Sequence, residues 1–184
     1  MEYARFTEGS NSIDYLEKAV SFIKSAENKP EDWKWVILSA HGALYGFMIC
    51  TLQGTNPDNV STGKKQRLID FNDALKRCQD PAWMNLGGFT KVLQLSQNQK
   101  LALRRLHSEF RNQFVHYRPT SWSIQLDGMP EILMQAFDAL CAVLEMGCYY
   151  PHFEPGDNNR IAALVAQGKD LLQNAQLAGQ SKNG

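Results

Sequence analysis

The sequence predicts an all-α fold, an antiparallel up-and-down helical bundle with four main helices and additional short and C-terminal ones. Apolar residues recur at spacings of three and four along most of the chain, which is the period of an amphipathic helix. Clusters of glycine, proline and polar residues separate these segments, as they do where helices end. The 184 residues are 43% hydrophobic and 21% charged, a balance typical of one globular domain with its own core. We therefore predict a single domain over residues 1–180 and a disordered tail at 181–184.

The first two helices are predicted over residues 12–27 and 30–52. The second begins at Pro30, because proline is pre-organised for the first position of a helix. It is apolar nearly all round, as a buried central helix should be. Its uncharged stretch 36–52 has the minimum length that can span a membrane. This stretch includes Ser39 and His41, so we interpret it as a core helix and expect no membrane association.

The later elements follow from capping and helix-ending signals. Ser96 and Gln99 have the spacing of a capping box, in which each side chain bonds the other residue's backbone N–H. The helix that starts there should run to Tyr117, because Pro119 disfavours helical geometry in the residue before it. The alternating segment 120–128 fits a short strand or an extended loop. The other predicted elements are a loop over 53–65, helices over 65–79, 130–149 and 158–177, and an irregular stretch with one helical turn over 80–89.

Composition excludes several classes of function. Lys plus Arg and Asp plus Glu both number 19, and a neutral chain is no general nucleic-acid binder, since such binding comes from neutralised phosphates. The N-terminus has no apolar core, so it does not read as a secretory signal. No two cysteines form a C-x-x-C pair, and we interpret the four as buried thiols in the reducing cytoplasm. The sequence has no Glu-x-x-His pair and no phosphate-binding glycine loop, so neither a metal nor a cofactor is expected.

The helix predicted over 96–117 carries a polar motif, "RNQFVH", beside a core stripe. At about 100° per residue, Asn112 and His116 fall on one flank, together with Arg105 and Glu109. Arg111 lies on the opposite flank, roughly 140° from His116. A helix distortion, a bending side chain or a second copy of the chain is needed to bring the arginine beside the histidine. The core stripe consists of Leu103, Leu106, Phe110, Phe114 and Tyr117.

Positive charge is concentrated on the same helix. Residues 100–118 contain five basic side chains and a single acid, Glu109. This patch would attract a phosphate-bearing partner such as RNA or a nucleotide. The alternative is an ordinary solvated helix surface. As the substrate-binding candidates we take Arg104, Arg105, Glu109 and Arg118.

The motif "RNQFVH" resembles the R-x4–6-H motif of the HEPN superfamily. In both, an arginine, a polar residue and a histidine follow in this order on a late helix of an α-bundle. Arg111, Asn112 and His116 match that motif in order and spacing. The resemblance covers about residues 12–150. It implies a metal-independent endoribonuclease of a toxin–antitoxin or phage-defence system, with an antitoxin protein as a further partner. It also implies a homodimer in which the Arg and His of both chains line one cleft.

The chemistry of these residues suits RNA cleavage by attack of the 2′-OH on the adjacent phosphate. Arg111 would bind and stabilise the phosphate, because a guanidinium is always charged and forms bidentate bonds. His116 would be the general acid/base, because an imidazole titrates near neutral pH. Asn112 would position these groups, and Glu109 would tune the charge of the histidine.

Two other functions remain open from the sequence. One is a non-catalytic module that binds a nucleotide, RNA or a protein partner at the same place. The other is a structural dimerisation bundle in which Arg111 and Asn112 form interface hydrogen bonds. Among the remaining candidates, we expect His41 to be a bonded core residue, His107 to lie on the surface, and Trp122 to pack against the bundle rather than stack on a base.

Overall fold

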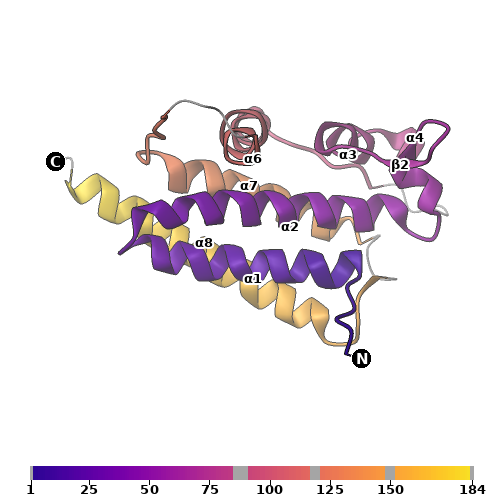
Figure 1. The fold of residues 1–184 in the computed structure, drawn as a ribbon, viewed down its shortest axis with the longest axis horizontal. Coiled ribbons are helices and arrows are strands. Elements are labelled where there is room, and N and C mark those ends of the chain that lie inside the picture. Colours follow the sequence, from indigo (N-terminus) through magenta and orange to yellow (C-terminus); the bar gives the residue numbers. More distant parts are fainter. Residues whose placement is uncertain (1, 85–90, 117–120, 148–151, 183–184) are drawn as a thin grey trace.

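The computed structural model describes residues 2–84, 91–116, 121–147 and 152–182, and it confirms the all-α class (Figure 1). Two short turns of 3-10 helix, Pro30–Asp32 and Pro57–Val60, and a π-helix at Arg105–Arg111 connect or extend the α-helices. The α-helices are α1 (Glu8–Ala26), α2 (Trp33–Gln53), α3 (Phe71–Cys78), α4 (Pro81–Met84), α5 (Gln97–Arg104), α6 (Asn112–Val115), α7 (Met129–Glu145) and α8 (Asp157–Lys182).

Four long helices, α1, α2, α7 and α8, run along the length of the molecule. The most extensive pairing joins α1 to α2, which form a hairpin through the turn at Pro30. Small residues permit their close approach: a Cβ added at Gly46 would lie 2.2 Å from the Oγ of Ser12 on α1. Glycine is needed at this crossing because any side chain would overlap the neighbouring helix.

The central position predicted for the second helix is confirmed. Residues such as Val36, Ile37 and Phe47 of α2 are fully enclosed by the helices around it. Among the described residues, one stretch, Pro30–Gln53, is long and apolar enough to cross a membrane, and 78% of its most apolar window is buried inside the fold. Such burial is what the core helix of a bundle requires.

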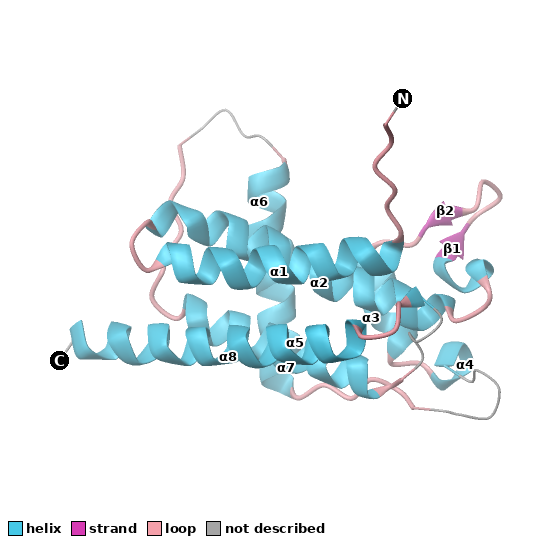
Figure 2. Ribbon diagram, turned by 90° about the horizontal axis from the view of Figure 1, so that it is seen from below, coloured by secondary structure: helices cyan, strands magenta, loops and turns pink. Residues whose placement is uncertain are grey.

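The motif helix, by which we mean α5, the π-helix and α6 together (Gln97–Val115), differs in direction from the other long helices. Figure 1 shows α6 end-on while α1 and α2 lie in the plane, and Figure 2 shows the motif helix running across them. It packs against α2 and α7. The sequence pattern predicted its existence and its buried face, but not this crosswise placement.

Other bounds also differ from the prediction, and α1 begins at Glu8, four residues before its predicted start. Residues 65–70 do not begin the third helix: a two-stranded hairpin, β1 (Ser61–Thr62) and β2 (Arg67–Leu68), precedes α3, and Asp70 caps that helix by accepting from the Asp73 N–H at 2.9 Å. Residues 121–126 form neither helix nor strand, which agrees with the loop of the two predicted alternatives. Helix α8 reaches Lys182, five residues beyond the predicted end.

Candidate functional site

The backbone of the motif helix starts as predicted and then changes its hydrogen-bond pattern. Ser96 and Gln99 form the capping box, with bonds of 3.2 and 2.8 Å. After one α-helical segment the chain enters the π-helix, and the N–H of Asn112 then bonds to the carbonyl of His107, five residues earlier. A π-helix replaces i→i−4 bonds with i→i−5 bonds and is found mostly as a short bulge, often at a functional site. This distortion ends at Arg111, the first residue of the motif.

The predicted core stripe of this helix is confirmed as far as the structure describes it. Leu103 and Leu106 are fully buried, Phe110 is 7% exposed, and Phe114 is half-buried. Tyr117 lies outside the described residues. The stripe seats the helix on α2 and α7, and thereby determines which side chains point away from the bundle.

Arg111 and Asn112 are bonded to each other. Nη1 of Arg111 donates to Oδ1 of Asn112 at 2.9 Å, and both side chains are half-buried. The bond uses one of the five N–H donors of the guanidinium and leaves the others available to bind an anion. Asn112 therefore orients the arginine and not, as the i, i+4 spacing suggested, the imidazole of His116.

Within the described residues, no hydrogen bond joins His116 to the arginine. His116 follows the last turn of α6, in extended geometry at φ −101°, and its N–H bonds to the carbonyl of Asn112 at 3.0 Å. Its side chain is exposed and, within the described residues, makes no hydrogen bond or ion pair. One chain thus presents the motif's histidine to solvent.

The predicted substrate-binding residues form a looser group. Arg105 donates to Glu109 at 3.1 Å, an exposed i, i+4 pair of the kind that contributes little stability. Glu109 is thereby engaged with Arg105. Arg104 is exposed and available to a ligand. Arg118 lies outside the described residues.

A pair of histidines lies beside the arginine. Nε2 of His41, on α2, and Nδ1 of His107, on the π-helix, are 2.9 Å apart. The two rings are nearly coplanar, at 17°, and their centres are 5.1 Å apart. This separation is close to the bond length plus the two ring radii, so the imidazoles meet edge to edge along one line. The surface position predicted for His107 is wrong, because the ring is half-buried against α2.

The ring of Phe71 covers this pair. Its centre is 4.4 Å from that of His41 and 4.8 Å from that of His107, and it is within 27° of parallel to both. Phe71 is the first residue of α3, so the cap at Asp70 fixes the ring that restrains both imidazoles. Three helices therefore converge on one His–His bond. The expectation that His41 is a bonded core residue is confirmed, since it is 6% exposed.

Burial and charge keep both imidazoles neutral. Burial, followed by the neighbouring His107 and Arg111, lowers the pKa of His41 to about 3. Burial also lowers the pKa of His107, followed by the positive charge of Arg111, while Asp70 acts in the opposite direction. Burial raises the pKa of Tyr45, one turn after His41, and the charge of Asp70 adds to this. The site therefore combines one cation, one anion and two uncharged proton-transfer groups.

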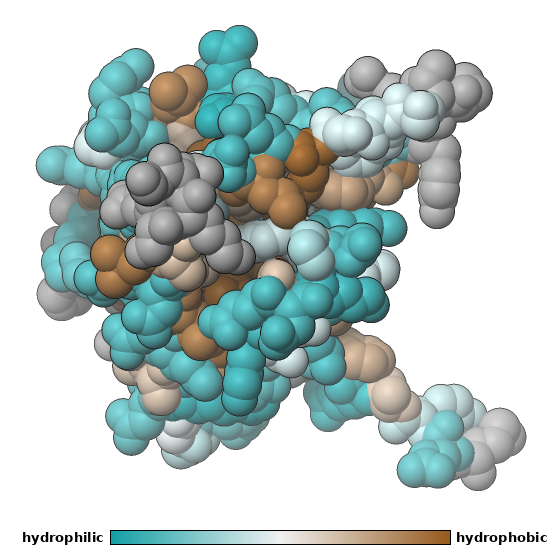
Figure 3. Space-filling model, turned by 90° about the vertical axis from the view of Figure 1, so that its left-hand side faces the viewer, coloured by the Kyte–Doolittle hydropathy of each residue, from teal (hydrophilic) through white to brown (hydrophobic). Residues whose placement is uncertain are grey.

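A pocket of about 350 Å³ lies by the last turn of the motif helix. Phe114 and Trp122 line it with ring centres 4.8 Å apart, and Nζ of Lys34 is 5.8 Å from the Phe114 ring. Trp122 packs against the bundle as predicted, yet it remains 38% exposed. Figure 3 views the molecule from the side of the turn at Pro30, and hydrophobic atoms are visible across the middle of that face.

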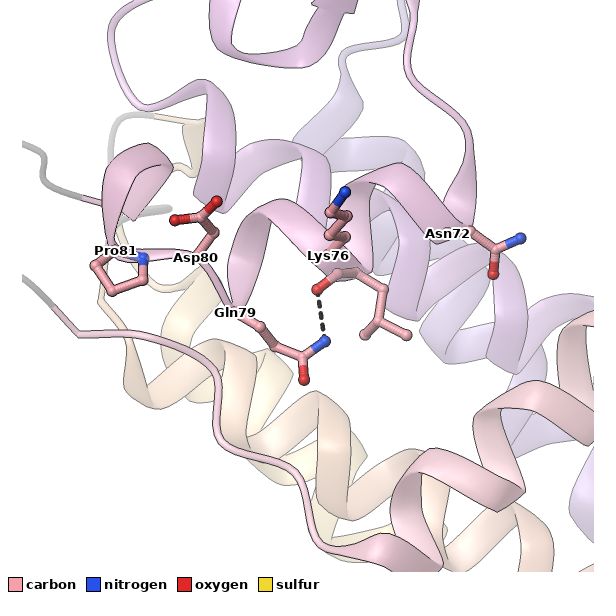
Figure 4. Close-up of a pocket in the computed structure, with 6 residues that line it drawn as sticks. Asn72, Lys76, Gln79, Asp80 and Pro81 are labelled. Carbon is pink, nitrogen blue, oxygen red and sulfur yellow. Dashed lines mark hydrogen bonds between the residues drawn. The ribbon is translucent and has the colours of Figure 1, made fainter.

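The other hollows are separate from the motif. One of about 500 Å³ runs along α3 and the start of α4, where the amide of Gln79 donates to the Leu75 carbonyl at 2.9 Å (Figure 4). Lys76 and Asp80 are its charged residues. Within the described residues, no three His, Cys, Asp or Glu side chains lie close enough together to hold a metal ion.

Sequence reasoning missed the His41–His107 pair, although a signal was present. His107 precedes Arg111 by four residues, and His41 precedes Tyr45 by four, so each lies one turn from a polar neighbour on its own helix. Nothing in the sequence pairs α2 with the motif helix at these two positions.

A comparison of the chain with family models, with curated proteins and with solved structures finds no match.

Proposed function

We propose that this protein is a HEPN-like, metal-independent endoribonuclease acting in the cytoplasm within a toxin–antitoxin or phage-defence system. The observation that carries the proposal is the placement of Arg111, which is held by Asn112 and lies beside two imidazoles that burial keeps neutral. A fixed guanidinium can stabilise the charge on a phosphate, and a neutral imidazole can accept a proton. Both are needed when the 2′-OH of RNA attacks the adjacent phosphodiester.

In this proposal the guanidinium of Arg111 binds the non-bridging oxygens of the scissile phosphate. It stabilises the extra negative charge that develops as the 2′-oxygen attacks, and it does so from a position fixed before the substrate arrives. Arg104 and Arg105 lie one to two turns earlier on the same helix and attract the neighbouring phosphates. His116 transfers a proton to the leaving oxygen.

The separation of Arg111 and His116 in one chain supports a homodimeric form of this site. Because His116 is exposed at the end of α6, it is free to reach a second copy of the motif helix. A two-fold dimer would place each His116 beside the other chain's Arg111, giving two equivalent sites. Residues lining the cleft would then come from both chains.

The test is cleavage of a 5′-labelled single-stranded RNA by the purified protein in EDTA. We expect products with a 2′,3′-cyclic phosphate, and at least a 100-fold loss of rate in Arg111→Ala and in His116→Ala. Arg67→Ala, which removes an exposed arginine from β2, is the matched control and should cleave at the wild-type rate. Inert wild-type protein, or equal cleavage by all variants, would refute the proposal.

The second candidate function is RNA or nucleotide binding without turnover. The pocket beside Phe114 and Trp122 favours it, because exposed aromatic rings stack on unpaired bases and Lys34 supplies a nearby positive charge. Fluorescence anisotropy with a labelled oligonucleotide distinguishes the two functions. Tight binding that Trp122→Ala weakens, with the RNA left intact, would favour the binding module.

A further inference from the structure

The motif's own histidine is poorly placed to work with Arg111 in the same chain. His116 lies about 140° round the helix from Arg111. His107, by contrast, precedes Arg111 by four residues within the π-helix, about one turn earlier and on the same side of the helix. After burial, the charge of Arg111 is the next cause that lowers the pKa of His107. Of the two, His107 is thus the imidazole that can share a phosphate with Arg111 of its own chain.

The bond to His41 decides which nitrogen of His107 is free. A neutral imidazole has one N–H and one lone pair, so in a bond between two neutral rings one donates and the other accepts. Nδ1 of His107 is the atom in the bond, which leaves Nε2 for other partners. If Nδ1 carries the proton and donates to Nε2 of His41, then Nε2 of His107 carries a lone pair.

We propose that His107 is a catalytic general base of this site, and that His41 is a positioning residue which accepts the Nδ1–H bond and keeps Nε2 of His107 unprotonated. The inference rests on the proposed function and adds a second imidazole to it. The 2′-oxygen loses its proton to Nε2 of His107 as it bonds to phosphorus. The bond from phosphorus to the 5′-oxygen breaks, and that oxygen takes a proton from the imidazolium of His116. The products are a 2′,3′-cyclic phosphate and a 5′-OH, and solvent restores both histidines.

The surroundings of His107 suit a base that must be charged only briefly. His41 faces it from α2, Asp70 acts on it from the start of α3, and Arg111 acts on it from its own helix. Arg111 and burial disfavour the imidazolium between turnovers, whereas Asp70 limits that penalty. Phe71 keeps the ring from rotating out of line, so the lone pair stays aimed at the same point.

The first test compares the pH dependence of RNA cleavage in His107→Gln, His41→Gln and the wild type. We expect His107→Gln to lose about 100-fold or more in rate, while binding of a 2′-O-methyl RNA, which cannot be cleaved, changes less than threefold. His41→Gln should shift the acid limb of the profile. His152→Gln, which removes an imidazole outside this cluster, is the control. A His107→Gln enzyme with wild-type rate and profile would overturn the inference and leave the proposed function standing.

The second test needs no variant and no activity. Nitrogen-15 NMR of the imidazoles reports which nitrogen of each neutral histidine carries the proton. We expect Nδ1 of His107 to be protonated and Nε2 to be bare, with the Nε2 signal moving when the 2′-O-methyl RNA is added. The reverse tautomer, with a proton on Nε2, would overturn the inference even if the protein cleaves RNA. A wild type that cleaves no RNA would remove the proposed function and the role of His107 with it.

Discussion

Acidification should destabilise this protein through a single buried histidine. The pKa of His41 falls from its ordinary 6.5 to about 3 in the folded state. Between these values the unfolded chain binds a proton that the folded chain does not, so stability is full above about pH 6.5 and is lost as the pH falls. One such group changes the free energy of unfolding by about 1.4 kcal/mol per pH unit within that window. Between pH 7 and pH 5 the loss amounts to about 2 kcal/mol.

The assay is urea denaturation followed by circular dichroism at pH 7 and pH 5, in the wild type and in His41→Gln. Glutamine retains a group that bonds to His107 but does not titrate, so the variant should lose about 2 kcal/mol less than the wild type over the same interval. His107, whose pKa is also lowered, contributes in the same direction and remains in both proteins. An identical loss in the two proteins would show that His41 is not held neutral by burial, and the reasoning about the His–His bond would fail with it.

Three further predictions concern packing and reactivity. Gly46→Ala should lower the free energy of unfolding, measured by urea titration, by about 1–3 kcal/mol, because the new methyl would overlap Ser12. Gly179→Ala is the control and should leave the free energy of unfolding unchanged, because a Cβ there meets nothing within 4 Å. Phe71→Ala should cost about 3–5 kcal/mol in the same assay, since the buried ring leaves a cavity over the histidines. Burial raises the pKa of Cys50 to about 12, so iodoacetamide should modify it in urea and spare it in the native protein at pH 8, as mass spectrometry would record.

Local patterns predicted the helices well because the signals are local. The capping box at Ser96 and the apolar stripe through Leu103 and Leu106 depend on residues within one or two turns, and both are confirmed. Cys50 and Cys78 are buried, as predicted, Cys141 is half-buried, and Cys148 lies outside the described residues. Burial periodicity depends only on the helix itself, whichever way that helix crosses its neighbours.

The site was harder to predict because it depends on pairings distant in sequence. The two bonded histidines are 66 residues apart, and only the packing of α2 against the motif helix brings them together. The spacing of apolar residues did not indicate the π-helix, because Leu106 and Phe110 stay on the buried face in either helical form. The start of α3 was misplaced because the hairpin Ser61–Leu68 is held by tertiary contacts, including the bonds from the Arg77 guanidinium to the Ser61 carbonyl at 3.3 Å.

Mixing variants can establish which residues of the site share a chain. If Arg111 and His107 act together within one chain and His116 comes from the partner, then mixed Arg111→Ala and His116→Ala proteins should recover activity. With random pairing of equal amounts, half of the dimers are mixed and each holds one intact site of two, so about a quarter of the wild-type rate should return. Mixing Arg111→Ala with His107→Gln should restore nothing, because every site then lacks one of the two. Recovery in that second mixture would mean that His107 serves the arginine of the other chain, whereas failure of both mixtures would place the whole site in one chain.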